Sequence, residues 1–225
     1  MTPRWYAAVS AGVCLAAALC AAPEAAEFWD ETPFQSWSDK QVQKVISDSP
    51  WAHEVAVALP PGRPTESGFG PATGRGGEST EPAGFGPSFR VRLAVSWRSA
   101  LPVKQAIARS QAGLNGTLSA ENQEFLSKPE KFYVIAVAGM PPQFGATPLR
   151  SIKDASSLKV EGKPPIPADD VTFLRNVMVM LVAFPRTTEF TLADREVEFV
   201  TKVGEFGVKA KFKLKDMLFH GQLSL

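Results

Sequence analysis

Residues 196–215 read EVEFVTKVGEFGVKAKFKLK and carry the clearest structural signal in the chain. Apolar and polar side chains alternate along residues 196–202 and again along residues 206–215, which is the period-two pattern of strands with one buried face. Gly204 lies between the two runs, so a short turn joins them into a hairpin. We therefore expect a sheet that turns one face to a core and the other to water.

The second strand of this hairpin has a lysine at every other position: Lys209, Lys211, Lys213 and Lys215. A strand places alternate side chains on one face, roughly 6.6 to 7 Å apart, so the four lysines form a row. Such a row could bind a polyanion, for instance a lipid headgroup, an envelope polysaccharide or an acidic partner. The alternative, which the sequence favours, is a solvated face on which the lysines pair with Glu196 and Glu198 and stabilise the hairpin modestly.

Other strands are predicted by the same alternation or by continuous apolar runs. They are residues 53–59, 89–97, 132–138, 157–161 and 177–184, and residues 218–225 add an edge strand. Short helices are expected at residues 39–47, at residues 101–110 and after Ser119. The first helix has a well-marked start, because Ser38 and Gln41 fit a capping box. The aromatic residues around it are expected to hold it against the domain rather than to bind a ligand: Phe28, Trp29, Phe34, Trp37 and Trp51.

The order of these elements indicates an α+β domain with a mixed or antiparallel sheet and short helices mainly on one face. Two helices stand between strands 89–97 and 132–138, an arrangement that resembles a right-handed crossover. Residues 60–88 interrupt the pattern with eight glycines and six prolines in 29 positions. Such a segment buries too little apolar surface to offset its ordering entropy, so we expect a long disordered loop between two strands.

The N-terminal 26 residues have the layout of a secretory signal peptide. A positive start precedes residues 5–22, which are uncharged and rich in alanine, and small residues follow. We expect cleavage within residues 20–26, which leaves a single domain of residues 27–225; an uncleaved membrane anchor is the alternative. If Cys14 and Cys20 leave with the signal peptide, the exported chain has no cysteine and no disulfide.

Composition argues against several classes of function. The chain has 24 basic and 23 acidic side chains, a net charge of +1, which removes the overall charge argument for nucleic acid as a partner. Its two histidines, His53 and His220, do not suggest a catalytic triad or a zinc site and are expected on the surface or in loops. Ser156 and Lys159 fit the S-x-x-K pattern of some serine acyl-enzymes, but the companion motifs of those enzymes are missing. We predict no cofactor and no metal site.

Carboxylates offer the one route to catalysis that the sequence leaves open. They are Asp169, Asp170, Asp194 and Glu196, which could serve a secreted hydrolase if a cleft shifted the pKa of one of them. In a strand, however, Glu196 and Glu198 face the same side, away from their apolar neighbours. That pattern favours a solvated sheet face over a catalytic pair.

Two parts of the chain resemble a known group of proteins. The segment QVQKVISDSPWAHEV lies at residues 41–55, and FPR at residues 184–186 precedes REVEFVTKVG and KAKFKLKDMLFHGQLSL at the C-terminal end. Together they resemble a group of uncharacterised exported bacterial proteins of similar length. The resemblance implies export, and it implies no activity.

These observations indicate an exported, non-catalytic domain that binds or scaffolds a component of the bacterial cell envelope, in the periplasm or outside the cell. The alternative is a secreted hydrolase that uses paired carboxylates. The expected partner is an envelope component or another protein, not a nucleic acid. No transmembrane segment is expected after the signal peptide has been removed.

Overall fold

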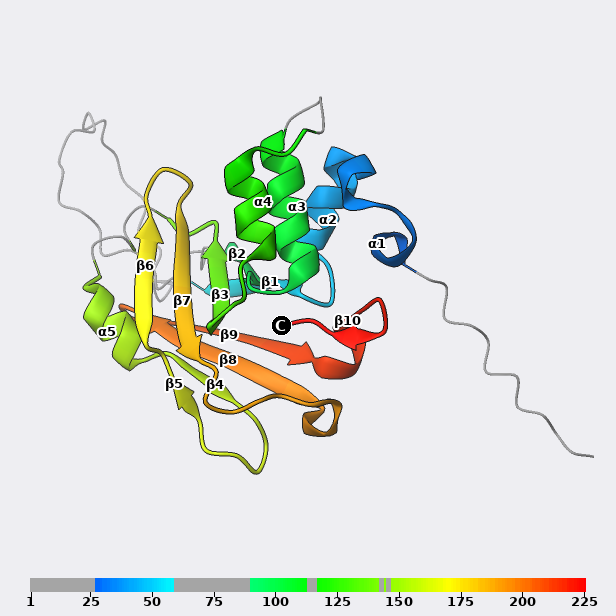
Figure 1. Ribbon diagram of the computed structural model, residues 1–225. Coiled ribbons are helices and arrows are strands. Elements are labelled where there is room, and N and C mark those ends of the chain that lie inside the picture. Colours follow the sequence, from blue (N-terminus) through cyan, green and yellow to red (C-terminus); the bar gives the residue numbers. More distant parts are fainter. Residues whose placement is uncertain (1–26, 59–89, 113–116, 142–143, 145–146) are drawn as a thin grey trace, which may run out of the picture.

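Figure 1 shows the computed structural model of the chain, which describes residues 27–58, 90–112, 117–141, 144 and 147–225. The predicted signal segment 1–26 and the predicted loop 60–88 lie outside the described residues. The described residues form an α+β structure of antiparallel sheets and short helices, which confirms the predicted fold class.

The strands build two sheets and a small separate hairpin. The first sheet has the order β1-β2-β3-β7-β6, with β1 at Ala52–Ala58, β2 at Arg90–Trp97, β3 at Phe132–Ala138, β7 at Val179–Pro185 and β6 at Asp170–Leu174. The second has the order β5-β4-β8-β9, with β5 at Ile166–Pro167, β4 at Ser157–Lys159, β8 at Glu196–Val203 and β9 at Phe206–Lys213. The hairpin consists of β10 at Leu218–Phe219 and β11 at Gln222–Leu223. Neighbouring strands in both sheets are antiparallel.

The core lies between the two sheets. The strand register places Trp97 opposite Ile135 on the inward face of the first sheet, and both side chains are fully buried. The second sheet contributes Phe199 and Phe212, whose rings lie 6.1 Å from the ring of Phe184 and 5.4 Å from that of Trp97, respectively. The alternation along β9 therefore turns its apolar residues inward, as the sequence predicted.

Four of the five α-helices among the described residues lie on one side of this core. The five are α1 at Phe28–Glu31, α2 at Asp39–Ser47, α3 at Leu101–Ala112, α4 at Ala120–Ser127 and α5 at Leu149–Asp154. Figure 1 shows α1 to α4 gathered on one side, where α2 contacts β1, β2 and α3, whereas α5 lies away from them against β6 and β8. The capping box of α2 is present: Ser38 Oγ accepts a hydrogen bond from the Gln41 N–H at 3.4 Å, and Gln41 Oε1 accepts one from the Ser38 N–H at 2.9 Å. Ser119 caps α4 by a single bond, in which its Oγ accepts from the Asn122 N–H at 3.2 Å.

The aromatic residues around α2 hold it to the domain, as expected. Trp37 and Trp51 are fully buried, and the rings of Trp29 and Trp51 meet edge-to-face at 5.5 Å. The Nε1–H of Trp51 donates to the carbonyl oxygen of Ser224 at 2.9 Å, and Ser224 Oγ accepts from the backbone N–H of Leu101, the first residue of α3. One serine near the C-terminal end thus ties together segments from the beginning and the middle of the chain.

The predicted crossover is wrong. Strands β2 and β3 pair antiparallel, whereas a crossover joins parallel strands. The reason is that α3 and α4, which contact each other, return the chain to the end of the sheet that it left. Accordingly the backbone N–H of Arg98, just after β2, donates to the carbonyl oxygen of Val134, near the start of β3.

Several predicted strands also differ from those in the structure. The apolar run 177–184 begins in a turn, where Val177 is 57% exposed and Met178 has φ +52°, so β7 starts at residue 179 and pairs with the unpredicted β6. Strand β9 ends at Lys213, because residues 214–216 form a 3-10 turn. Residues 218–225 add no edge strand to either sheet, since β10 and β11 pair with each other.

Candidate functional site

The outer face of the second sheet holds three of the four lysines that the sequence singled out. Lys209, Lys211 and Lys213 alternate along β9 with buried residues and are exposed. The strand register adds Lys159 of β4 and Lys202 of β8 to the same face. We call these five residues the cationic face: Lys159, Lys202, Lys209, Lys211 and Lys213.

Glutamates neutralise only part of the cationic face. Lys211 Nζ lies 2.8 Å from Glu196 Oε1, and this hydrogen bond raises the pKa of Lys211. Glu198 faces the same side, opposite Lys211 and Lys159 in the neighbouring strands. The other four lysines form no ion pair with any described residue. Five lysines against two glutamates give the outward side chains of β4, β8 and β9 a net charge of +3.

Lys215 does not belong to the cationic face, which corrects the predicted row of four. It lies in the 3-10 helix η4 (Leu214–Asp216), where its Nζ is 3.8 Å from Asp216 Oδ1. It lines a separate hollow of about 540 Å³, together with Asp30, Asp48 and His53. The alternation of the sequence continues past the end of the strand, but the backbone turns away and carries Lys215 with it.

His53 is not the surface or loop residue that the sequence suggested. It lies within β1, half-buried, and its ring centroid is 5.2 Å from that of Phe212. Burial lowers the pKa of His53, against the opposing effect of Asp48. His220 is exposed in the turn between β10 and β11, as expected, and its backbone N–H donates to Asp30 Oδ1 at 2.8 Å. The two histidines play different structural roles.

The carboxylates proposed for catalysis lie on different elements. Asp170 is on β6, on the outer face of the first sheet, whereas Glu196 is on the outer face of the second and pairs with Lys211. Asp194 accepts hydrogen bonds from Lys163 Nζ at 2.6 Å and from a backbone N–H, and the bond from Lys163 lowers the pKa of Asp194. Asp169 is exposed just before β6. A catalytic acid needs a raised pKa, so the lowered pKa of Asp194 argues against that role. Asp194 is better suited to stabilising its loop.

The S-x-x-K pattern does not form a site. Ser156 is buried, and its Oγ donates to the carbonyl oxygen of Ile152 at 2.6 Å and lies 2.7 Å from Thr201 Oγ1. Lys159 points out from the opposite face of the sheet. Among the described residues, no group of three or more histidine, cysteine, aspartate or glutamate side chains could hold a metal ion.

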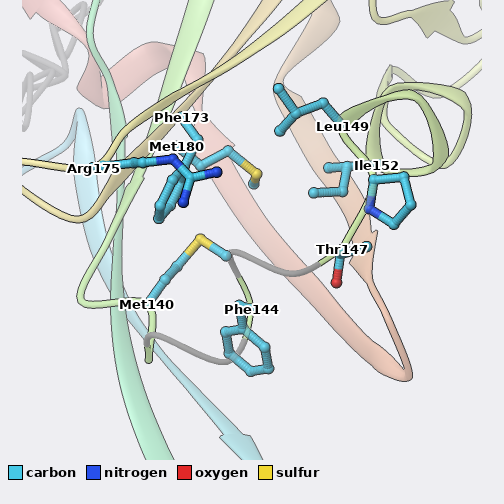
Figure 2. Close-up of a pocket in the computed structure, with 9 residues that line it drawn as sticks. Met140, Phe144, Thr147, Leu149, Ile152, Phe173, Arg175 and Met180 are labelled. Carbon is cyan, nitrogen blue, oxygen red and sulfur yellow. The ribbon is translucent and has the colours of Figure 1, made fainter.

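An apolar pocket lies between α5, the turn end of β6 and β7, and the segment that follows β3 (Figure 2). Its volume is about 310 Å³. The residues that line it are Met140, Phe144, Thr147, Pro148, Leu149, Ile152, Phe173, Arg175 and Met180. The sequence analysis missed this pocket, because no single segment supplies it and no motif marks its members.

Comparisons with known proteins found no relative of this chain. No protein-family model, no curated protein and no solved structure matches it. In the part of the chain that the structure describes, no helix is long and apolar enough to cross a membrane. The functional argument therefore rests on the residues and their geometry.

Proposed function

We propose that this protein is an exported, non-catalytic binding domain of the bacterial cell envelope and that its cationic face holds an anionic polymer. The observation that carries the proposal is the face itself, on which four lysines remain without an ion pair among the described residues. Lysines that only balanced their neighbours across the sheet would each have a carboxylate partner. The surplus of positive charge instead suits a ligand that carries repeated negative charges.

The spacing of the face also suits a polymer. Lys209 and Lys213 stand at alternate outward positions of β9, and the row continues across the sheet to Lys202 and Lys159. Side chains repeat roughly every 6.6 to 7 Å along a strand, and strands lie about 4.8 Å apart. A chain with regular phosphate, sulfate or carboxylate groups can therefore contact several lysines at once. The hydrolase alternative has less support, because Asp194 and Glu196 are engaged by lysines.

Replacing the three unpaired lysines of β8 and β9 should abolish most polyanion binding. We expect Lys202→Gln, Lys209→Gln and Lys213→Gln together to weaken binding to immobilised heparin at least roughly tenfold, since one charge contact at 4 Å contributes about 1 kcal/mol in water. Binding of the unaltered protein should also fall steeply with salt, because exposed charges are screened within about 8 Å at physiological ionic strength. The measurement is the dissociation constant as a function of salt concentration.

A matched control distinguishes binding by the cationic face from binding by the overall positive charge of the protein. Lys40, Lys128 and Lys131 are exposed lysines on other elements, and changing all three to glutamine removes the same charge. We expect this control variant to bind heparin as the unaltered protein does. Equal loss in both triple variants would reduce the binding to overall charge and refute the proposal for the face.

Export is a separate part of the proposal, supported by the signal-like layout of residues 1–26. N-terminal sequencing of the protein from its native host should begin between residues 21 and 27. A start at Met1 in a cytosolic fraction would contradict export and with it the proposed envelope ligand.

A further inference from the structure

Buried apolar side chains form the floor of the pocket in Figure 2. Met140, Phe144, Ile152 and Met180 are each at most 4% exposed, although all four line the cavity. They come from the segment after β3, from α5 and from β7, so three separate parts of the chain build the cavity. Its volume of about 310 Å³ lies at the lower end of the range of roughly 300 to 1,000 Å³ for small-molecule sites.

Arg175 is the one charged residue among those that line the pocket. It lies in the turn that follows β6 and is exposed, and Figure 2 shows its side chain extending beside Phe173 and Met180. It forms no ion pair and no hydrogen bond with any described residue. A guanidinium offers a planar set of donors that matches a carboxylate, so this group is suited to an anionic ligand.

We propose that this pocket binds a medium-chain fatty acid, with the alkyl chain among the methionines and aromatic rings and the carboxylate on Arg175. The pairing of an apolar cavity with one unpaired cation matches a ligand that has one apolar chain and one anionic end. The two methionines support this choice, because their unbranched, polarizable side chains adapt to a flexible chain better than branched ones do. The site is distinct from the cationic face and does not depend on the function proposed for it.

Chain length provides the first test of the proposal. Isothermal titration of the purified protein with hexanoate, octanoate and decanoate, each below its micelle concentration, should show an increase in affinity of up to about fourfold per methylene group, from the transfer free energy of a buried methylene. The increase should stop once the chain fills the cavity. Decanol should bind at least about tenfold more weakly than decanoate, because it lacks the charge that Arg175 recognises. Equal affinity for all three acids, or for decanol and decanoate, would overturn the proposal.

Two variants test the site itself. Arg175→Gln should reduce the affinity for decanoate at least about tenfold and leave the affinity for decanol unchanged. Leu149→Glu, at a rim position that is 44% exposed, should abolish decanoate binding by placing a negative charge in the apolar lining that would receive the alkyl chain. The matched controls are Arg150→Gln on α5 and Leu192→Glu, since Leu192 is 51% exposed and lies outside the pocket. Retained binding in both site variants, or equal loss in the controls, would refute the assignment.

Discussion

Replacing Phe212 by alanine is expected to reduce the free energy of unfolding by about 3 to 5 kcal/mol, the usual cost of removing a buried aromatic ring. Phe212 is fully buried, and its ring contacts Trp97 of the first sheet at 5.4 Å and His53 of β1 at 5.2 Å. The side chain therefore joins the two layers of the core, and its loss leaves a cavity between them. Urea unfolding measures the loss, and we expect the slope of the unfolding free energy against urea concentration to stay the same.

Phe34 provides the comparison for this experiment. It is only partly buried and packs at the edge of the core, with its ring 6.4 Å from that of Trp37. Phe34→Ala should therefore cost clearly less than Phe212→Ala. If Phe212→Ala cost less than about 1 kcal/mol, the two faces of β9 would be assigned the wrong way round, and the cationic face would lose its structural basis.

A second large loss of stability is expected when the buried ion pair between α3 and the segment after α4 is broken. Lys104 is 3% exposed, and its Nζ lies 2.7 Å from Glu130 Oε1 and 3.3 Å from the carbonyl oxygen of Lys128. Glu130→Ala leaves this ammonium group buried without a carboxylate. We expect a loss of about 3 kcal/mol in the free energy of unfolding, near the lower end for broken buried pairs because Glu130 is 27% exposed.

Two further variants show whether burial is the cause. Glu27→Ala breaks the pair with Lys44, in which both side chains are about half exposed, and should cost less than about 1 kcal/mol. Lys104→Met combined with Glu130→Leu removes both charges and should recover most of the lost stability. Similar losses for Glu27→Ala and Glu130→Ala would show that water reaches Lys104 and that the pair is an ordinary surface contact.

Local signals in the sequence predicted local structure well. The capping box at Ser38 and Gln41 marked the start of α2, because a cap acts within a few residues. Alternation predicted β1, β2, β8 and β9 and the face that each buries. The turn glycine Gly204 has φ +61°, a conformation that glycine adopts at little cost.

The errors have a common physical origin, since they concern features that depend on distant parts of the chain. Val177 and Met178 are apolar residues in a turn, so hydrophobicity alone extended the strand through them. Lys215 continues the alternation, although the backbone has already left the sheet. The pocket is the extreme case, because Met140 and Met180 meet there only through the pairing of β3 with β7.

The hydrogen bond between Trp51 and Ser224 joins positions 173 residues apart, and it bears on the order in which the chain can fold. The first sheet is covered by β8 and β9, so a nascent chain that has been synthesised only to β7 still exposes Trp97 and Phe184 to water. The core therefore stays incomplete until β8 and β9 have been synthesised, and long-range pairing of this kind is slow to form. The chain has to be kept from aggregating for the whole interval between its first helix and its last strand.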